Sequence, residues 1–387
     1  MIVANEHMDR TGTPTCYHGG AFFSAIGAEF NHLERRHDII AADVLDAWFP
    51  PSPRVVAALL EDLPWLLRTS PPTHCEGLVN VIARQRGVAP VNVLPGAGSS
   101  DLIFRAFRQW LRPSSRVLIL DPTYGEYAHV LEHVVGCTVE RLFLSRENGY
   151  RIDLKLLRAR LRNNYQLVVL VNPNSPTGQH VPRTDLLAVL RNVPESTLVW
   201  IDETYVEFAD GDQSLETSAA RSRNVVVCKS MSKVYGLSGA RVAYLCGPGN
   251  VVAGLRAITP PWVVSLPAQV AAVAALQDRD YYTACYQQTH SFRAQLVPKL
   301  SQLGGWEILA GIANFVLCHL PADGPNAAEL VAACREHNLF IRDADAMGSG
   351  FGGRAVRIAV KDKETNQRMT ELLGRALGRF CFDSVGP

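Results

Sequence analysis

A lysine, an arginine and several hydroxyl residues are gathered in the segment SMSKVYGLSGAR at residues 230–241. The amine of Lys233 can clamp a phosphate, or it can attack a carbonyl carbon and form a Schiff base. Arg241 and the hydroxyl groups of Ser230 and Ser232 are hydrogen-bond donors that suit an anion. An isolated lysine in such a loop is ordinarily solvated. The arginine and the two serines beside it favour an anion site.

A second candidate anion site is the glycine-rich segment GAGSS at residues 96–100, which opens a stretch with helical periodicity. Free backbone N–H groups at the start of a helix attract phosphate, and Ser99 and Ser100 add hydroxyl donors. Ser99, Ser100 and Asp101 also stand where N-cap residues belong. The alternative is therefore that Gly98 makes a tight turn and Ser100 caps the helix. The residues alone leave both interpretations open.

An aspartate and two tyrosines follow other apolar runs. Asp202 directly follows LVWI, so we expect it to be partly buried and to need a cationic or donor partner. A turn or helix-capping aspartate is the alternative. The aromatic rings of Tyr124 and Tyr205 could stack on a flat cofactor, although core aromatics are more common.

The segments that precede these residues are short apolar runs, rich in Val, Leu and Ile and without strict alternation: residues 115–121, 165–171, 196–202, 224–230 and 240–246. Such runs are typical of strands buried on both faces of a parallel or mixed sheet. Between them, residues 100–111 and 183–193 have helical periodicity, with Leu102, Ile103, Ala106 and Trp110 on one stripe. This alternation of strands and helices predicts an α/β domain.

The polar clusters share one feature, because each follows a predicted strand: GAGSS, DPTYGEY, NPNSPTG, DETY and KSMSK. In open α/β sheets, ligands bind beyond the carboxyl ends of the strands. Clusters at five equivalent places therefore predict one shared site.

The chain is long enough for two domains, since it has 387 residues. The sequence pattern changes after about residue 255, and residues 267–300 predict a long helical stretch with few breaks. Shorter apolar runs at 313–320 and 354–361 then surround a predicted helix at 326–338. We therefore predict an N-terminal arm and part of a small domain at 1–55, a large domain at 56–270 and a smaller α+β domain at 271–387.

Composition excludes several classes of function. Charged residues make up 19% of the chain and the net charge is +1, which gives no reason to expect nucleic acid or an acidic membrane as partner. No apolar run reaches the roughly 18 residues that a membrane span needs, and the N-terminus lacks a signal-peptide pattern. The 9 cysteines are scattered and never form CxxC, which argues against a disulfide framework and against a metal site. We expect a cytoplasmic protein.

As an ordered set, these motifs resemble the fold-type I pyridoxal-phosphate enzymes, aminotransferase class I/II. Within that class the chain is most similar to the histidinol-phosphate aminotransferase and threonine-phosphate decarboxylase branch. The resemblance extends from CYHGG at 16–20 to residue 369, and its strongest stretches are SMSKVYGLSGARVAYL, DETYVEF, NPNSPTG and DPTYGEY. It implies a large domain with a mostly parallel sheet flanked by helices, a smaller α+β domain, pyridoxal 5'-phosphate as cofactor, and a homodimer with the active site at the subunit interface.

The resemblance also implies a role for each cofactor-side residue. Lys233 resembles the lysine that forms the Schiff base and moves the substrate's Cα proton. Asp202 would pair with the pyridine nitrogen of the cofactor and keep it protonated. Tyr205 would donate to the phenolic oxygen of the ring, and Tyr124 would stack on its face. The phosphate would be held by Gly98, Ser99, Ser100, Ser230, Ser232 and Arg241.

On the substrate side, Arg357 resembles the arginine that grips the substrate carboxylate in a bidentate manner. Arg342 is similar to a second substrate-side cation, and Asn314 matches a position near the substrate. CYHGG and Arg342 could suit a phosphorylated or acidic side chain, or could be structural.

Three departures from the family pattern fall on the substrate side or at the ring oxygen. Ser175 replaces the asparagine that bonds the ring oxygen in relatives. The segment LDAWFPPSP at 45–53 lacks the family's Asn, and LRTSPPTHCEG at 67–77 replaces an Arg-Tyr-Pro motif.

The leading hypothesis is an aminotransferase that acts at Cα of an amino acid. The departures keep open a second hypothesis, in which the same cofactor supports decarboxylation, elimination or carbon–carbon bond formation, including on a substrate like S-adenosylmethionine. A nicotinamide oxidoreductase is disfavoured, because neither GAGSSD nor GPGNVVAG completes G-x-G-x-x-G. An inactive DNA-binding regulator is disfavoured because Lys233 is present and no helix-turn-helix segment precedes the enzyme-like part.

Overall fold

The computed structural model describes residues 19–27 and 29–382, with side chains described as far as residue 380. The chain divides into two compact units. The large unit comprises residues 49–174 and 179–287, and the small unit comprises the residues up to Trp48, 175–178 and those from 288 onward. The chain passes between the two units after residues 48 and 287, whereas the domain boundaries predicted from the sequence lie after residues 55 and 270. The assignment of a function to each predicted domain stays a prediction.

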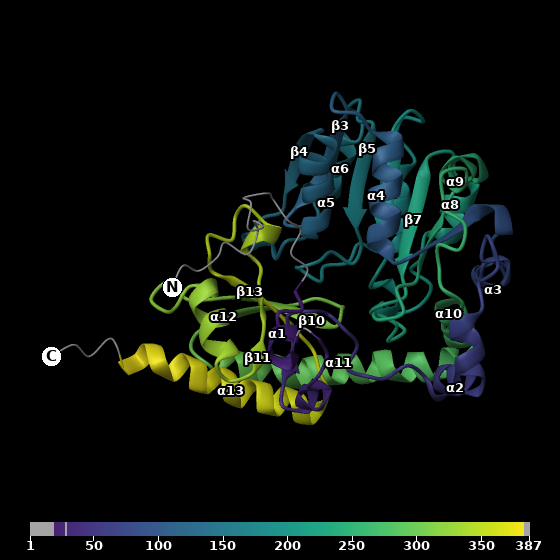
Figure 1. Cartoon of the computed structure of the whole chain (residues 1–387). Helices are drawn as coiled ribbons and strands as arrows, with labels where there is room; N and C mark the ends of the chain where they lie inside the picture. The colour runs from purple at the N-terminus through teal and green to yellow at the C-terminus, as the bar shows by residue number, and fades with distance from the viewer. Residues whose placement is uncertain (1–18, 28, 383–387) are drawn as a thin grey trace. The chain divides into compact units, whose positions relative to one another are not determined.

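The large unit is built on a seven-stranded sheet with the order β2-β8-β7-β6-β5-β3-β4 (Figure 1). Only β8 runs against its neighbours, so the predicted mostly parallel sheet is confirmed. The strands are β2 (Val93–Gly96), β3 (Arg116–Asp121), β4 (Thr138–Phe143), β5 (Leu167–Val171), β6 (Leu198–Asp202), β7 (Val225–Ser230) and β8 (Ala243–Cys246). Because β2, β3, β5, β6 and β7 share one direction, the five polar clusters that follow them begin at the same edge of the sheet.

Helices complete the large unit. Its elements include α2 (Pro53–Arg68), α3 (Glu76–Arg86), α4 (Ser99–Trp110), α5 (Gly125–His129), α6 (Leu154–Arg160), α7 (Arg183–Leu190), α8 (Glu216–Arg221), α9 (Gly249–Arg256) and α10 (Leu266–Leu276). The predicted helical stretch over 267–300 contains one break. Helix α10 ends in a tighter turn, in which the N–H groups of Gln277 and Asp278 bond to carbonyls three residues back, before α11 (Arg279–Ser301) begins.

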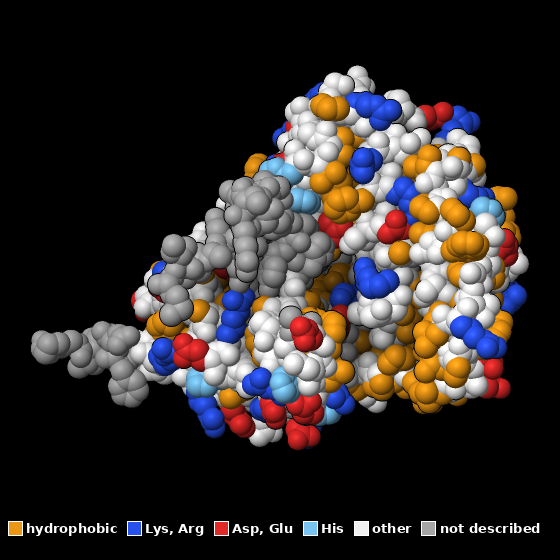
Figure 2. Space-filling view, in the orientation of Figure 1, with side chains coloured by type: hydrophobic (Ala, Val, Ile, Leu, Met, Phe, Trp, Pro, Cys, Tyr) orange, Lys and Arg blue, Asp and Glu red, His pale blue; other side chains and the backbone are white. Residues whose placement is uncertain are grey.

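Helix α2 packs against α10 and leaves apolar side chains in solvent. Its N-terminus is capped by Ser52, whose hydroxyl accepts from the N–H of Val55 at 3.4 Å. Four side chains make up what we call the apolar face of α2: Val56, Leu60, Trp65 and Leu67. Leu60 is 67% exposed and Leu67 is 70% exposed. Figure 2 shows hydrophobic side chains gathered on the side of the large unit where α2 and α9 lie. So much exposed apolar surface is unusual on a protein that acts alone.

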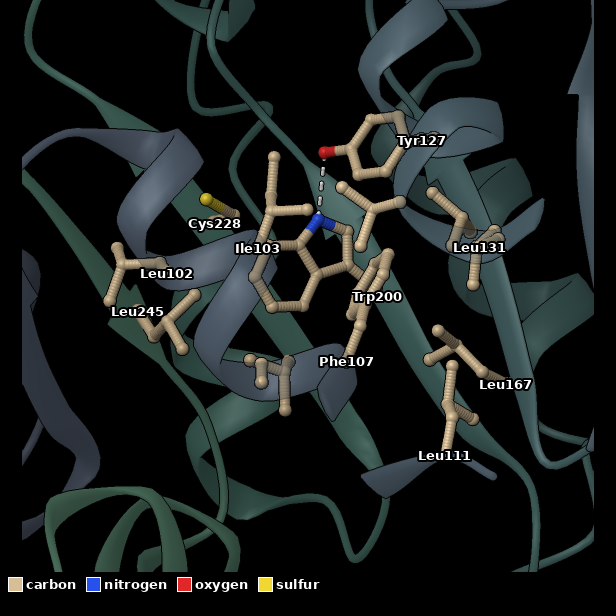
Figure 3. Close-up of a cluster of buried hydrophobic side chains, with 14 of the residues drawn as sticks. Leu102, Ile103, Phe107, Leu111, Tyr127, Leu131, Leu167, Trp200, Cys228 and Leu245 are labelled. Carbon is tan, nitrogen blue, oxygen red and sulfur yellow. Dashed lines mark hydrogen bonds between the residues drawn. The ribbon is translucent and has the colours of Figure 1, made fainter. Parts of the chain in front are cut away.

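The core that supports the polar clusters lies between the sheet and α4 with α5 (Figure 3). Helix α4 buries Leu102, Ile103 and Ala106 of the predicted apolar stripe, and it also buries Phe107. Trp110, the fourth residue of that stripe, is half-buried. Trp200 of β6 is fully buried among them, with its ring centroid 5.2 Å from that of Phe107 in an edge-on arrangement. Burying aromatic rings of this size contributes several kcal/mol to stability, roughly 2–3 kcal/mol per side chain.

The small unit is an α+β assembly. An antiparallel sheet has the order β12-β13-β10-β9, and a parallel pair joins β1 to β11. Its elements include α1 (Phe23–Ile26), β1 (Ile40–Ala41), β9 (Glu307–Ala310), β10 (Phe315–His319), α12 (Ala327–Arg335), β11 (Leu339–Phe340), β12 (Arg342–Asp343), β13 (Ala355–Ala359) and α13 (Lys363–Phe382). Helix α12 begins with a reciprocal capping box between Asn326 and Glu329, which fixes the start that the sequence predicts at residue 326.

Three further observations concern the described residues alone. None of their helices combines the length and the apolar character needed to cross a membrane. No group of three or more His, Cys, Asp or Glu among them is placed to hold a metal ion. The cysteines whose side chains are described are all buried free thiols: Cys75, Cys137, Cys228, Cys246, Cys285, Cys318 and Cys334.

Two glycines meet inside the small unit. Gly178 has a left-handed φ of +68°, and its carbonyl oxygen accepts from the N–H of Ile312 at 3.0 Å. A Cβ built on Gly311 would overlap the carbonyl group and Cα of Gly178. The obstacle is backbone rather than a flexible side chain, so only glycine at 311 allows this approach.

We expect Gly311→Ala to lower the free energy of unfolding by about 2 kcal/mol or more, because the added methyl group must push backbone aside. Chemical denaturation measures the change. Gly378→Ala is a matched control, since Gly378 lies in α13 of the same unit and a Cβ added there would meet nothing within 4 Å. The control should be neutral or stabilising by up to about 1 kcal/mol. Equal effects of the two variants would contradict the close approach of the two glycines.

Candidate active site

The glycine-rich segment forms the turn between β2 and α4. Gly98 has a φ of +91° and is the N-cap of α4, so the alternative interpretation, in which Ser100 caps the helix, is wrong. Ser100 lies inside the helix and donates to Glu126 Oε2 at 3.0 Å instead, while Asp101 accepts from the N–H of Ala97 at 2.9 Å. No described side chain caps α4. The positive end of this 12-residue helix is therefore available to an anion.

Arg241 packs directly on Gly98. A Cβ at Gly98 would overlap the Arg241 guanidinium group, so the absence of a side chain at this position makes room for the arginine. Arg241 itself has a left-handed φ of 54°, and its NH1 group donates to the carbonyl of Ser238 at 3.1 Å. No carboxylate within the described part of the chain forms an ion pair with Arg241. A glycine turn, a helix N-terminus and a cation thus converge at one place.

Lys233 lies in the loop that follows β7. The buried strand ends at Ser230, whose Oγ accepts from the N–H of Ser232 at 3.3 Å. The half-buried Lys233 places its Nζ 3.5 Å from the hydroxyl oxygen of Ser238, and Ser238 in turn donates to the carbonyl of Ser232 at 3.2 Å. Ser238 therefore connects the lysine to both Ser232 and Arg241.

Asp202 ends β6 with only 4% of its surface exposed. Its Oδ1 accepts from the backbone N–H of Thr204 at 2.9 Å and from the Thr204 hydroxyl at 2.6 Å. Its Oδ2 accepts from the hydroxyl of Tyr127 at 2.6 Å. Burial raises the pKa of Asp202, and the bonds from Thr204 and Tyr127 oppose this rise because they favour the ionised carboxylate.

Two more predicted residues, Tyr124 and Tyr205, belong to the same unit. Tyr124 precedes α5 and donates to Glu126 Oε2 at 2.6 Å, the same oxygen that Ser100 contacts. Tyr205 follows Asp202 in the chain and is 7% exposed. The cofactor-side residues predicted from the sequence thus all follow strands that end at one edge of the sheet.

The substrate-side residues belong to the small unit. Arg342 of β12 and Arg357 of β13 stand directly opposite each other in the antiparallel register. Arg357 NH1 donates to Ser175 Oγ at 3.1 Å, and its NH2 donates to the carbonyl of Asp43 at 3.0 Å. Asn314 donates to the carbonyl of Leu45 at 2.9 Å. Arg342, Arg357 and Ser175 are therefore brought together, whereas the side-chain amide of Asn314 binds backbone. CYHGG lies largely outside the described residues.

Comparison with known proteins bears on this set of residues. Residues 45–374 match the family model described as aminotransferase class I and II. The chain belongs to this family. Membership confirms the sequence-based predictions of the fold, of an aminotransferase and of pyridoxal phosphate as its cofactor.

Similar proteins share most of the length of this aminotransferase. The histidinol-phosphate aminotransferase of Anaeromyxobacter sp. (strain Fw109-5) is 33% identical over 330 residues, which cover 85% of this chain and 88% of that protein. The solved structure of histidinol-phosphate aminotransferase from Sinorhizobium meliloti, in complex with pyridoxal-5'-phosphate, has a TM-score of 0.80 at 25% identity and covers 94% of this chain and 99% of that one. The L-threonine-O-3-phosphate decarboxylase from Porphyromonas gingivalis has a TM-score of 0.72 at 25% identity, with 85% of this chain and 99% of that chain covered.

The residues present in the aminotransferase fit its cofactor. A phosphate needs several donors and a cation, and the uncapped start of α4 lies against the guanidinium group of Arg241. A pyridine nitrogen needs a carboxylate partner, and the buried Asp202 accepts hydrogen bonds from Thr204 and Tyr127 that favour its ionised form. The fit rests on the space that Gly98 leaves, since a side chain there would displace Arg241.

The sequence patterns assigned no role to three residues of this aminotransferase that contact its predicted site. Glu126 accepts from both Ser100 and Tyr124, and it is 1% exposed. Tyr127 contacts Asp202, and Trp200 donates to the Tyr127 hydroxyl at 2.9 Å. A glutamate inside the motif DPTYGEY was the available signal, because a carboxylate in such a buried position needs donors.

A further group that the sequence patterns did not reveal is the buried ion cluster of Arg86, Glu203, Glu207, Glu216 and Lys229. Lys229 of β7 is 2% exposed, and its Nζ lies 2.7 Å from Glu207 Oε1 and 3.6 Å from Glu203 Oε2. Arg86 contacts Glu207 at 3.2 Å and Glu216 at 3.4 Å. Lys229 sits on the face of β7 opposite to Cys228 and Ser230, so the cluster lies across the sheet from Asp202. A lysine within the apolar run NVVVCKS is the signal that could have revealed it.

The buried ion cluster holds three carboxylates and two cations, so one carboxylate is favoured in its neutral form. Burial raises the pKa of Glu203 from 4.5 to about 7, against the attraction of Lys229. Burial alone would lower the pKa of Lys229, but Glu207, Glu216 and Glu203 together raise it to about 12. Glu203 is therefore the group of the cluster that takes up a proton near neutral pH.

This raised pKa predicts a pH-dependent stability. The folded protein binds the Glu203 proton more tightly than the unfolded chain does, so this stabilisation is present below pH 4.5 and is lost as the pH rises through about 7. Glu203→Gln cannot titrate. Between pH 5 and 8 we expect the wild-type free energy of unfolding to fall by about 1–3 kcal/mol relative to this variant.

Denaturant unfolding at several pH values measures the difference. Glu195→Gln is the control, because Glu195 is exposed and pairs only with the exposed Arg223 in the contacts described. It should keep the wild-type pH profile. A Glu203→Gln profile parallel to that of the wild type would contradict a neutral Glu203.

Proposed function

We propose that this aminotransferase acts on an amino-acid-like substrate that carries an additional anionic group, with a phosphate ester as the best match. The observation that carries the proposal is the pair of arginines on β12 and β13. Arg342 is 6% exposed and Arg357 is 4% exposed, and the register places them directly opposite each other. Like charges at such positions destabilise a sheet, and burying them adds a desolvation cost.

A bound dianion offsets both costs, because guanidinium groups bind phosphate and carboxylate in a bidentate manner. Two contacts of Arg357, with Ser175 Oγ and with the Asp43 carbonyl, orient its guanidinium group. The relatives named above also support the proposal, since their names refer to histidinol phosphate and threonine phosphate.

The chain's own residues divide the work of transamination. Pyridoxal phosphate, when bound, supplies an electron-poor ring that stabilises negative charge at the substrate carbon. Lys233 Nζ takes the proton from the substrate's Cα. Asp202 would hold the proton of the ring nitrogen, Tyr205 would donate to the ring oxygen, and Tyr124 would stack on the ring. The phosphate of the cofactor would be held by Gly98, Ser99, Ser100, Ser230, Ser232 and Arg241.

Lys233→Ala tests the reaction. Purified wild-type protein should show the visible absorption band of lysine-bound cofactor, and an amino donor should shift it. The variant should lack that band and lose at least about 10³-fold in activity, because the residue that binds the cofactor covalently and moves the Cα proton is gone. Ser238→Ala, which removes only the neighbouring hydroxyl, should retain the band. A Lys233→Ala protein with the wild-type band would contradict the assignment.

Product analysis separates transamination from other reactions of the same cofactor. Mass spectrometry should find an oxo product and the aminated form of the cofactor after incubation with the amine substrate. Release of carbon dioxide or of an elimination product in place of the oxo product would contradict transamination.

The substrate proposal is tested at Arg342. For Arg342→Gln we expect the KM for histidinol phosphate to rise about tenfold or more, since a charge-assisted hydrogen bond contributes roughly 1.5–3 kcal/mol. The KM for unphosphorylated histidinol should change little. Arg354→Gln is the control, because Arg354 donates to the carbonyls of Pro321 and Gly324 in the same unit. Equal changes for both substrates in Arg342→Gln would contradict phosphate recognition.

We further infer that the enzyme is a homodimer that uses the apolar face of α2. The support is the exposure of Val56, Leu60, Trp65 and Leu67 on one helix, together with Trp262, which is 55% exposed at a left-handed φ of 60°. An exposed tryptophan in strained backbone is costly unless another surface covers it.

Free thiols at the described cysteines support a reducing, cytoplasmic location.

Leu60→Glu is expected to convert the dimer to a monomer, because a charge at a buried interface costs several kcal/mol. Light scattering coupled to gel filtration measures the mass. Leu156→Glu, at another exposed leucine of the large unit, should leave the dimer intact. A wild-type protein that is monomeric at micromolar concentration would overturn this part of the proposal.

A further inference from the structure

We propose that Tyr127 is a positioning residue for the reaction, and that Trp200 fixes it in that role. The Tyr127 hydroxyl orients the Asp202 carboxylate so that one lone pair of Oδ2 is kept for the cofactor's ring nitrogen. The inference rests on the proposed role of Asp202 as the partner of that nitrogen.

The direction of each hydrogen bond follows from the chemistry of the three side chains. An indole N–H can only donate, so the 2.9 Å contact makes the Tyr127 oxygen the acceptor from Trp200 Nε1. Tyr127 has one hydroxyl hydrogen, and an ionised carboxylate can only accept. The hydrogen is therefore directed at Asp202 Oδ2, 2.6 Å away. Because Trp200 can only donate, the hydroxyl hydrogen of Tyr127 goes to Asp202.

A count of acceptor positions shows what remains on Asp202. A carboxylate has about four lone-pair positions, two on each oxygen. Oδ1 uses both of its positions on Thr204, through the backbone N–H and the hydroxyl. Oδ2 uses one position on Tyr127. The oxygen that Tyr127 holds is thus the one that keeps a position for a further donor.

The fold makes this arrangement rigid. Side chains two apart on a strand share a face, so Trp200 and Asp202 of β6 both face the layer that contains α4 and α5. Tyr127 reaches them from α5, and its ring centroid lies 6.0 Å from that of Phe107, which also packs edge-on against Trp200 (Figure 3). Tyr127 and Trp200 are fully buried, so packing holds both rings in place.

The groups around Asp202 show why the Tyr127 hydrogen bond matters for the pKa of this carboxylate. The titratable groups that act on it are Glu126, Tyr127 and the buried thiol of Cys228, and Glu126 acts to raise the pKa of Asp202. With burial also raising that pKa, the Thr204 and Tyr127 bonds are what oppose protonation of the carboxylate. Without Tyr127, Asp202 becomes a stronger base and withdraws the proton from the ring nitrogen.

The test uses the pH titration of the visible band of the holoenzyme. The nitrogen that joins Lys233 to the cofactor takes up a proton as the pH falls, and positive charge on the ring nitrogen lowers the pH midpoint. Tyr127→Phe should raise the midpoint by about 0.5 pH unit or more, and Asp202→Asn should raise it further. Trp200→Phe should produce a smaller rise, because it loosens Tyr127 but leaves the hydroxyl in place.

A matched control separates positioning from simple loss of stability. Tyr165→Phe removes a hydroxyl of a buried tyrosine that donates to Glu140 Oε2 at 2.8 Å, elsewhere in the same unit. It should leave the midpoint and the affinity of the cofactor-free protein for pyridoxal phosphate unchanged. Tyr127→Phe should weaken that affinity as well as shift the midpoint. In an Asp202→Asn background, Tyr127→Phe should cause no further shift.

The outcomes distinguish this inference from the proposal on which it rests. A shift in Asp202→Asn with none in Tyr127→Phe overturns the role of Tyr127 and leaves that of Asp202 intact. No shift in Asp202→Asn overturns the assignment of Asp202, and the inference with it. If Tyr127→Phe does not fold, Trp200→Phe decides, and an unchanged midpoint in that variant overturns the inference.

Discussion

The common direction of the strands in the large sheet is the constraint on which the other features depend. Strands β2, β3, β5, β6 and β7 all end at one edge, so five stretches that are far apart in the sequence begin along that edge. Strand β8 runs the opposite way, and this lets β2 join the sheet in the common direction. The glycine turn, the aspartate and the lysine therefore all lie at this edge without any long loop to bring them there.

Much of the fold and part of the site could be predicted from the sequence, because both depend on local pattern. Apolar runs located β3, β5, β6, β7 and β8, and the residues after several of them are the predicted site residues. The acceptor positions of Asp202 could not be predicted, because they depend on Tyr127 from a different element. The alternative in which Ser100 caps α4 is wrong for a related reason. The hydrogen bond from Ser100 to Glu126 is a tertiary contact that no local sequence preference reveals.

The buried ion cluster of the large unit could not be predicted from the sequence either. Lys229 lies in an apolar run and Glu203 follows the end of another, so each alone predicts an expensive burial. Only the packing of α3, β7, α8 and the turn at residues 206–208 shows that Arg86, Glu207 and Glu216 complete the cluster. The two faces of the sheet therefore differ in their electrostatics. On one face, neutral donors oppose the protonation of Asp202. The other face holds three carboxylates and two cations, and Glu203 takes up the one additional proton near neutral pH.

The overlap between a side chain at position 98 and the Arg241 guanidinium group has an evolutionary consequence. A side chain at position 98 would have to adopt a left-handed φ and would displace the end of the Arg241 side chain. Shortening Arg241 would in turn leave the start of α4 without its cation. A change at either position is therefore costly unless the other position changes with it, and we expect the two residues to be kept or replaced as a pair.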